Sequence, residues 1–217
     1  MVMIPKIGKA DYFEAKSFRP ISLTSFLFKT MEKITSWEIQ TTSLKDKPID
    51  SRQHAFQSGS STESALSIAA NYIESGIHKP GGYVLGVFLD VAGAFDNVCP
   101  KTAIRVLKKR KIKNTILNWY AHYLLNRQCT IDIKGVSISQ ALKKGTPQGG
   151  VLSVILWIII FDELLILYKG RVEIIGFADD GSLLIRGKKL SKMYALMQKA
   201  LDKADLCAKE CGLRLSP

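Results

Sequence analysis

Apolar runs that stop at aspartates dominate the hydrophobic pattern of this chain. In Glu173–Ile185, two such runs are joined by Asp179-Asp180-Gly181. This pattern predicts a β-hairpin whose turn carries two carboxylates, with Gly181 supplying the backbone freedom of the turn. A further apolar run, Tyr83–Leu89, predicts a strand that ends at Asp90.

The aspartates at these predicted strand ends are candidate functional residues. Aspartate is common in surface turns because its side chain bonds the local backbone, so the hairpin alone favours a solvated loop. If the strands lie side by side, Asp90 and Asp179 converge at one edge of a sheet, with Asp180 close behind. Such carboxylates need counter-charge, which hard cations such as Mg²⁺ supply. Two ions about 3.5–4 Å apart can support nucleotidyl transfer by activating a hydroxyl and stabilising a leaving phosphate oxygen.

Helical periodicity accounts for much of the remaining chain. The apolar stripes that predict helices are Leu27, Met31 and Ile34; Ala65, Ile68, Ala69, Tyr72 and Ile73; Ile116, Trp119, Tyr120, Tyr123 and Leu124; and Leu190, Met193, Met197, Ala200, Leu201 and Ala204. Ser60 and Glu63 have capping-box spacing, Pro100 suits a helix start and Gly212 suits a helix end. The run Val151–Phe161 is too short to cross a membrane, so it predicts a buried helix.

Polar and glycine-rich segments complete the pattern. Cys129–Ile133 and Val136–Ser139 alternate polar with apolar residues and predict a second hairpin. The basic loop Lys143–Gly150 leads into the helix at Val151, where backbone amides attract phosphate or let a ligand approach closely. Strands interleaved with helices and hairpins predict an α+β fold or an α/β sandwich, with helices covering a sheet.

Composition adds one strong signal, which is charge. The chain of 217 residues carries 31 Lys+Arg against 19 Asp+Glu, a net charge of +12. This surplus favours a polyanionic partner, with nucleic acid first and an acidic membrane second, over a merely soluble basic protein. The cysteines and histidines show no zinc-ribbon, zinc-protease or Ser-His-Asp spacing and no signal peptide precedes them, so we expect reduced thiols in an intracellular protein.

Motifs spread over nearly the whole chain resemble the reverse transcriptase domain of non-LTR (LINE-type) retrotransposons. In order, they are FRPISL (Phe18–Leu23), QHAFQSGSSTESAL (Gln53–Leu66), FLDVAGAFDNV (Phe88–Val98), GTPQGGVLS (Gly145–Ser153) and FADD (Phe177–Asp180). Each is weak alone, but the set in this order is specific. The wording QHAF…STESAL is most similar to Jockey-like and related arthropod-type elements. A group II intron-type or other bacterial reverse transcriptase shares the chemistry but differs in motif wording.

The resemblance implies an α+β fold, a polymerase palm in which an antiparallel sheet packs on helices, preceded by a fingers region. We therefore expect residues 1–80 to form the fingers region with part of the palm helices. Residues 81–217 are expected to form the palm region that carries the aspartates. Together they would make a single reverse transcriptase domain that is C-terminally truncated and lacks its thumb.

The resemblance also implies an RNA-directed DNA polymerase with RNA template, DNA primer and dNTPs as partners. The primer 3′-hydroxyl would attack the α-phosphate of a dNTP with two Mg²⁺ ions, or Mn²⁺, as cofactors. Asp90, Asp179 and Asp180 are the implied catalytic residues, and Asp90, Val91, Asp179 and Asp180 the implied metal site. Asp90 and Asp179 would bind both ions, with Asp180 at the edge of the site.

Nucleotide binding is implied for residues that lie elsewhere in the chain. Arg19 matches the family's arginine on the triphosphate, and Lys6 or Lys9 is a second candidate. Phe95 takes the position of the bulky side chain that blocks a ribose 2′-hydroxyl, although a plain core aromatic also fits. Gln148 and Gly149 would line the pocket for the incoming nucleotide and the template base, and Asp96 would be a hydrogen-bonding support.

Two departures from the family pattern favour an alternative. Ala55-Phe56-Gln57 and Gly59-Ser60-Ser61-Thr62 replace the usual Gly-Phe-Arg and Gly-Arg-Ser-Thr, which removes two customary basic contacts. The chain also stops at Ser216-Pro217, before the family's lysine that protonates pyrophosphate. The alternative is a catalytically inactive, truncated or decayed copy that at most binds nucleic acid. For either reading we expect no membrane association and a location in the nucleus or a cytoplasmic ribonucleoprotein of a eukaryotic cell.

Overall fold

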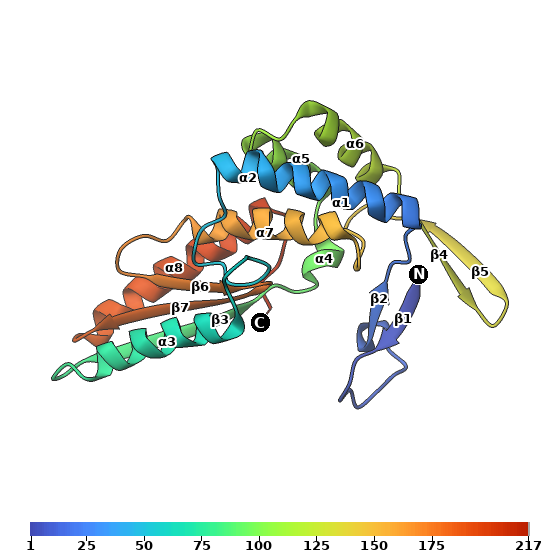
Figure 1. The fold of residues 1–217 in the computed structure, drawn as a ribbon. Helices are drawn as coiled ribbons and strands as arrows, with labels where there is room; N and C mark the ends of the chain where they lie inside the picture. Colours follow the sequence, from blue (N-terminus) through green and yellow to red (C-terminus); the bar gives the residue numbers. More distant parts are fainter. Residues whose placement is uncertain (217) are drawn as a thin grey trace. The chain divides into compact units, whose positions relative to one another are not determined.

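The computed structural model describes residues 1–216 (Figure 1). The chain divides into two compact units. Unit 1 combines Met1–Asp46 with Phe95–Leu156, and unit 2 combines Lys47–Ala94 with the chain from Trp157 onward. The units are therefore interleaved along the sequence. One of the three boundaries follows Asp46, and the other two fall inside the helices α4 (Ala94–Asn97) and α7 (Val151–Leu165).

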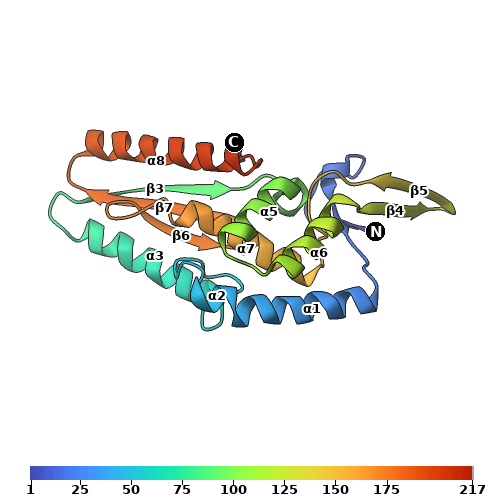
Figure 2. The ribbon, with the colours of Figure 1, turned by 90° about the horizontal axis from the view of Figure 1, so that it is seen from above.

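Unit 2 is built on a three-stranded antiparallel sheet in the order β3-β7-β6. The strands are β3 (Tyr83–Asp90), β6 (Glu173–Phe177) and β7 (Asp180–Gly187). The helices that accompany them are α3 (Thr62–Ile77) and α8 (Leu190–Glu210). Figure 2 shows α3 and α8 on opposite sides of these strands. Ala65 of α3 packs with Ile175 and Leu184, whereas Met193 of α8 lies against Gly187. Mixed helices and an antiparallel sheet confirm the predicted α+β class.

The turn between β6 and β7 begins one residue earlier and ends two residues earlier than the Asp179-Asp180-Gly181 turn that the sequence pattern predicted. Phe177 pairs with Asp180, so the turn is Ala178-Asp179, and Ala178 has a φ of +56°. Gly181 instead lies inside β7, where an added Cβ would stand 3.4 Å from the ring of Phe161. The prediction that Gly181 relaxes the turn was wrong, because an alanine takes the left-handed conformation here.

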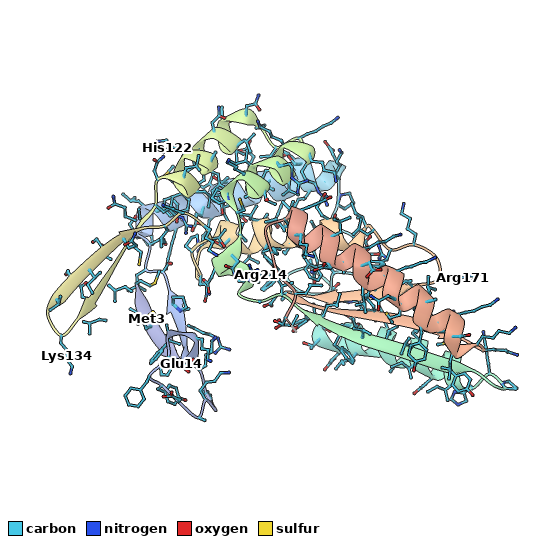
Figure 3. All side chains as sticks on the ribbon, turned by 180° about the vertical axis from the view of Figure 1, so that it is seen from behind. Met3, Glu14, His122, Lys134, Arg171 and Arg214 are labelled. Carbon is cyan, nitrogen blue, oxygen red and sulfur yellow. The ribbon has the colours of Figure 1, made fainter. Side chains whose placement is uncertain are left out.

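Unit 1 consists of two small hairpins and a group of helices. Its elements are β1 (Val2–Pro5), the 3-10 helix η1 (Ala15–Ser17), β2 (Phe18–Ile21), α1 (Phe26–Thr41), α2 (Ser43–Asp46), α5 (Pro100–Lys109), α6 (Asn114–Leu125), β4 (Gln128–Ile133), β5 (Val136–Ala141) and the first part of α7. β1 pairs antiparallel with β2, and β4 with β5. The second predicted hairpin is thus confirmed, and Figure 3 shows Lys134 at its tip.

Most of the predicted helix signals are confirmed, with local shifts. Pro100 occupies the first turn of α5, and Gly212, with a φ of +71°, follows the end of α8. The capping box of α3 uses Ser61 and Ser64, one residue later than the predicted Ser60 and Glu63. The cap shifts because the hydroxyl of Ser64 can bond back to the N–H of Ser61 at 2.9 Å.

Helix α7 is the most buried helix of the chain segment that the structure describes. Trp157 and Ile159 are 0% exposed, which confirms the prediction of a buried helix. Within residues 1–216, no helix combines the length and the hydropathy that crossing a membrane requires. The stripe on α1 differs from a core face, since Leu27 and Ile34 are 77% and 61% exposed.

Candidate active site

The strand register brings two of the predicted catalytic aspartates face to face. β3 pairs with β7, the second strand of the hairpin, so that Leu89 lies opposite Gly181 and Asp90 opposite Asp180. Residues directly opposite each other on an antiparallel pair project to the same face, with Cβ atoms about 4.5–5.5 Å apart. Asp179 occupies the adjoining turn. The ends of two strands that are distant in sequence therefore do meet.

Burial and the neighbouring carboxylates both affect the protonation of Asp180. The pKa of Asp180 is raised, first by burial and then by the charges of Asp179 and Asp90. A cation placed among these carboxylates would lower that pKa again and relieve the repulsion. Within residues 1–216, however, no set of three or more acidic, histidine or cysteine side chains is gathered closely enough to form a ready-made metal site. Asp90 and Asp180 are the face-to-face pair, because Asp179 sits in the turn rather than in the ladder.

A short segment near the C-terminus holds Asp90. Ser216 donates a hydrogen bond from Oγ to Asp90 Oδ2 at 2.7 Å, and its N–H donates to the Asp90 carbonyl at 2.7 Å. Val91 forms an antiparallel bridge with Leu215, and the N–H of Ala92 donates to the carbonyl of Arg214 at 2.9 Å. Sequence reasoning missed Ser216, although the alternation of Leu213-Arg214-Leu215 is typical of a short strand.

The turn that carries Asp179 is held by uncharged side chains. Gln53, which is 1% exposed, accepts hydrogen bonds on Oε1 from the N–H groups of Ala178 at 3.2 Å and Ala55 at 3.0 Å. Trp157 donates from Nε1 to the carbonyl of Ala178 at 3.0 Å. The QHAF motif thus stabilises the aspartate turn, a role that the sequence did not reveal because the two segments are far apart in the chain.

An apolar cavity of about 380 Å³ adjoins the aspartate pair within unit 2. Asp90 and Asp180 line it together with Phe88, which is 83% exposed. Its other walls come from α3, through Thr62, Ala65, Leu66 and Ala69, and from the sheet, through Leu89, Ile175, Phe177, Gly181 and Ser182. The carboxylates therefore stand beside an apolar surface that can receive the uncharged part of a substrate.

Several of the predicted nucleotide-binding residues gather in unit 1. Gln148 donates from Nε2 to Asp96 Oδ1 at 2.9 Å, and its carbonyl accepts from the N–H of Ser22 at 2.9 Å. Phe95 is half-buried, and its carbonyl accepts from the N–H of Thr146 at 2.7 Å. Gly149 has a φ of +99°. Asp96 acts as the hydrogen-bonding support that was expected.

The predicted triphosphate contacts belong to the β1–β2 hairpin of unit 1. Arg19 lies in β2 opposite Ile4 and is exposed. Lys6 donates from Nζ to the carbonyl of Lys16 at 2.9 Å, which uses one of the three N–H donors of its ammonium group. The residues predicted to form the metal site, Asp90, Val91, Asp179 and Asp180, all belong to unit 2.

Comparison with known proteins identifies the class to which this fold and these carboxylates belong. Residues 4–217 match the family described as "Reverse transcriptase (RNA-dependent DNA polymerase)", so the chain belongs to the reverse transcriptase family. Within that family it is a reverse transcriptase domain of the LINE type, because its curated relatives come from non-LTR retrotransposons. The family uses divalent metal ions.

Two of these relatives show the extent of the match. The Pol polyprotein of the type-1 retrotransposable element R1 from Bradysia coprophila is 28% identical over 203 residues, covering 93% of this chain and 20% of the relative. The RNA-directed DNA polymerase of the mobile element jockey from Drosophila melanogaster is 25% identical, covering 100% of this chain and 24% of the relative. The chain thus spans about a fifth to a quarter of the length of these relatives.

Solved structures support the fold. Telomerase from Candida tropicalis, in complex with a fragment of telomeric RNA, aligns with a TM-score of 0.66 at 14% identity. The alignment covers 94% of this chain and 38% of telomerase. At this identity the likeness shows the reverse transcriptase fold alone.

Proposed function

We propose that this chain is the catalytic part of an RNA-directed DNA polymerase that acts in retrotransposition of a non-LTR element. It would transfer a deoxynucleotide from a dNTP to the 3′-hydroxyl of a DNA primer on an RNA template. The observation that carries the proposal is the register of β3 on β7, which sets Asp90 opposite Asp180 beside the Asp179 turn. The net charge of +12 suits these nucleic-acid partners.

The carboxylates fit divalent metal in their chemistry, because Asp90 lies opposite Asp180 beside Asp179 and a bound cation would offset the repulsion among their charges. Asp90, Asp179 and Asp180 would hold Mg²⁺ or Mn²⁺; the side chain of Val91 is apolar and buried, so only its backbone carbonyl could contribute. When bound, two ions supply activation of the attacking hydroxyl and neutralise charge on departing pyrophosphate. Ser216 and Gln53 would orient the ligands, since both bond the segments that carry them.

Residues of unit 1 would bind the nucleotide. Arg19 and Lys6 would hold the triphosphate through charge-assisted hydrogen bonds. Phe95 would exclude a ribose 2′-hydroxyl and so select deoxynucleotides. Gln148 and Gly149 would contact the incoming nucleotide and the template base. In polymerase terms, we assign residues 1–80 to fingers with part of the palm helices, and 81–217 to palm, in the nucleus or a cytoplasmic ribonucleoprotein of a eukaryotic host.

The test is primer extension on an RNA template with Mg²⁺, comparing dNTPs with rNTPs. It should use the longest protein that contains this chain. Asp90→Asn and Asp179→Asn should each reduce synthesis by about 100-fold or more, because each removes a carboxylate that would hold the metal ions on which transition-state stabilisation depends. Asp202→Asn, on the exposed part of α8, is the matched control. Normal synthesis by the Asp179 variant would refute the proposal.

The same experiment distinguishes an active polymerase from a catalytically inactive copy. Nucleic-acid binding with no dNTP incorporation by the unmodified protein would support a decayed copy that only binds nucleic acid. The departures at Gln57 and Ser60, where the family usually carries arginine, favour this second candidate.

A further inference from the structure

A buried carboxylate lies at the start of α7 in unit 1. Glu32, in α1, is 0% exposed, and its Oε2 accepts a hydrogen bond from the N–H of Val151 at 3.2 Å. The N–H of Leu152 also acts on the same carboxylate as a donor. The first turn of a helix leaves such N–H groups without helical partners and carries partial positive charge. Glu32 therefore caps α7 from a different helix.

This cap is costly in free energy. Burial is the largest influence on the pKa of Glu32 and raises it, while the N–H groups of Val151 and Leu152 and the charge of Lys29 lower it. The second oxygen, Oε1, has no hydrogen-bond partner among the described residues. A buried ion can often be replaced by an apolar side chain without loss of stability. A carboxylate at this position therefore points to a need for a fixed geometry rather than for stability alone.

The loop Pro147–Gly150 packs against the same carboxylate. The N–H of Gly150 donates to the carbonyl of Pro147 at 3.0 Å, which closes the loop on itself. A Cβ added at Gly150 would lie 2.9 Å from Ser153 Oγ and 3.0 Å from Glu32 Oε1. There is thus no room for even a methyl group between the loop and Glu32, so a movement of this side chain is transmitted to the loop backbone.

We infer that Glu32 is a positioning residue, which fixes the first turn of α7 and through it the conformation in which Gln148 and Gly149 meet the incoming nucleotide. Gln148 is also held by Ser22 and Asp96, but those contacts act on Gln148 itself and leave the start of α7 free. Glu32 couples α1 to the start of α7 through the N–H of Val151. The inference rests on the proposed function for its nucleotide, but the contact between α1 and α7 can be tested without activity.

The first test measures hydrogen exchange in this chain. Glu32→Gln keeps the shape of the side chain and removes its charge, and we expect the amides of Val151 and Leu152 to exchange about tenfold faster. Glu38→Gln is the matched control, because Glu38 lies on the same helix, is half-exposed and pairs with Lys113. Unchanged exchange at Val151 and Leu152 in the Glu32 variant would overturn the inference.

The second test measures steady-state incorporation by the longest protein that contains the chain. Glu32→Gln should raise KM for dNTP about tenfold, the size expected for loss of a positioning contact, with kcat within about threefold of wild type. An unchanged KM, or an equal change in the Glu38 control, would contradict the positioning role. If the wild-type protein makes no DNA, the proposed function fails and the exchange result alone decides whether Glu32 fixes α7.

A further variant guards against a folding defect in Glu32→Gln. Gly150→Ala places its methyl group against Glu32 Oε1 and Ser153 Oγ, and so displaces the same contact from the side of the loop. It should speed exchange at Val151 and raise KM in the same direction. Wild-type values for both quantities would show that the loop does not depend on this contact.

Discussion

The two units hold their functional turns by different chemistry. In unit 2, the Ala178-Asp179 turn is fixed by uncharged groups, the amide of Gln53 and the indole of Trp157. In unit 1, the loop before α7 is fixed by the buried carboxylate of Glu32. A negative charge is useful at the positive end of a helix. Beside Asp90, Asp179 and Asp180 it would add to the repulsion that, together with the larger effect of burial, already raises the pKa of Asp180. The difference shows that the charge of a site limits which side chains can hold its turns in place.

The largest expected effect on stability comes from placing a charged support beside the aspartates of unit 2. Gln53→Glu keeps the acceptor for the N–H groups of Ala178 and Ala55 but adds a buried, unpaired negative charge. We expect a loss of about 3 kcal/mol in the free energy of unfolding at pH 7, measured by urea denaturation. The introduced carboxyl would have a raised pKa in the folded state, so the loss should shrink as the pH falls and this group becomes protonated.

Gln198→Glu, at an exposed position of α8, is the control for this change. It adds the same charge at an exposed position, where it also replaces the hydrogen bond from Gln198 to Asp202 by weak repulsion, and should lower the free energy of unfolding by less than about 1 kcal/mol. If both variants lost equal stability, the comparison between the two units would fail.

A smaller effect is expected where a hydroxyl supports the aspartate pair. Ser216→Ala removes the 2.7 Å hydrogen bond to Asp90 Oδ2 while the backbone contact of residue 216 remains. The Mg²⁺ concentration that gives half-maximal synthesis should rise about tenfold, because Asp90 loses its fixed orientation. Ser216→Thr, which keeps the hydroxyl, should restore the wild-type value. An unaltered Mg²⁺ titration in the alanine variant would exclude this supporting role.

The smallest effect concerns the backbone of the turn. Ala178 has a φ of +56°, a conformation that costs an L-residue about 1 kcal/mol and costs glycine little. Ala178→Gly should therefore stabilise the protein by up to about 1 kcal/mol in chemical denaturation. Ala195→Gly, on an exposed helical position of α8, should destabilise it by a similar amount. A loss of stability in the Ala178 variant would show that the turn is not strained.

Local patterns along the chain predicted the elements well, but not their long-range partners. Tyr83–Leu89 and the aspartate hairpin were identified because apolar runs broken by polar turns are local signals. The position of the turn was misassigned because sequence rules favour glycine at positive φ, whereas Ala178 is held there by Gln53 and Trp157. No local rule could show that these residues from distant segments would supply the hydrogen bonds.

The candidate site also combines features that local sequence patterns predict with contacts that they do not. That Asp90 and the aspartate hairpin would meet could be predicted from strand ends, but Asp180 rather than Asp179 faces Asp90 because the register, not the sequence, decides which residue is paired. Glu32 went unnoticed because a single acidic residue in an amphipathic helix normally faces solvent. The same helix shows the opposite error, because its apolar residues Leu27 and Ile34 are exposed. The apolar stripe of α1 therefore did not indicate which face of the helix is buried.

The segment that follows α8 connects the last described residues to Asp90 of the candidate active site. After Gly212, Arg214 and Ser216 bond to the backbone of Ala92 and Asp90 as a short added strand. Displacing this segment would leave the three-stranded sheet in place but would remove the hydrogen-bond partners of Asp90 and Ala92. A substitution that displaces it should therefore impair the candidate site more than it lowers the stability of the sheet.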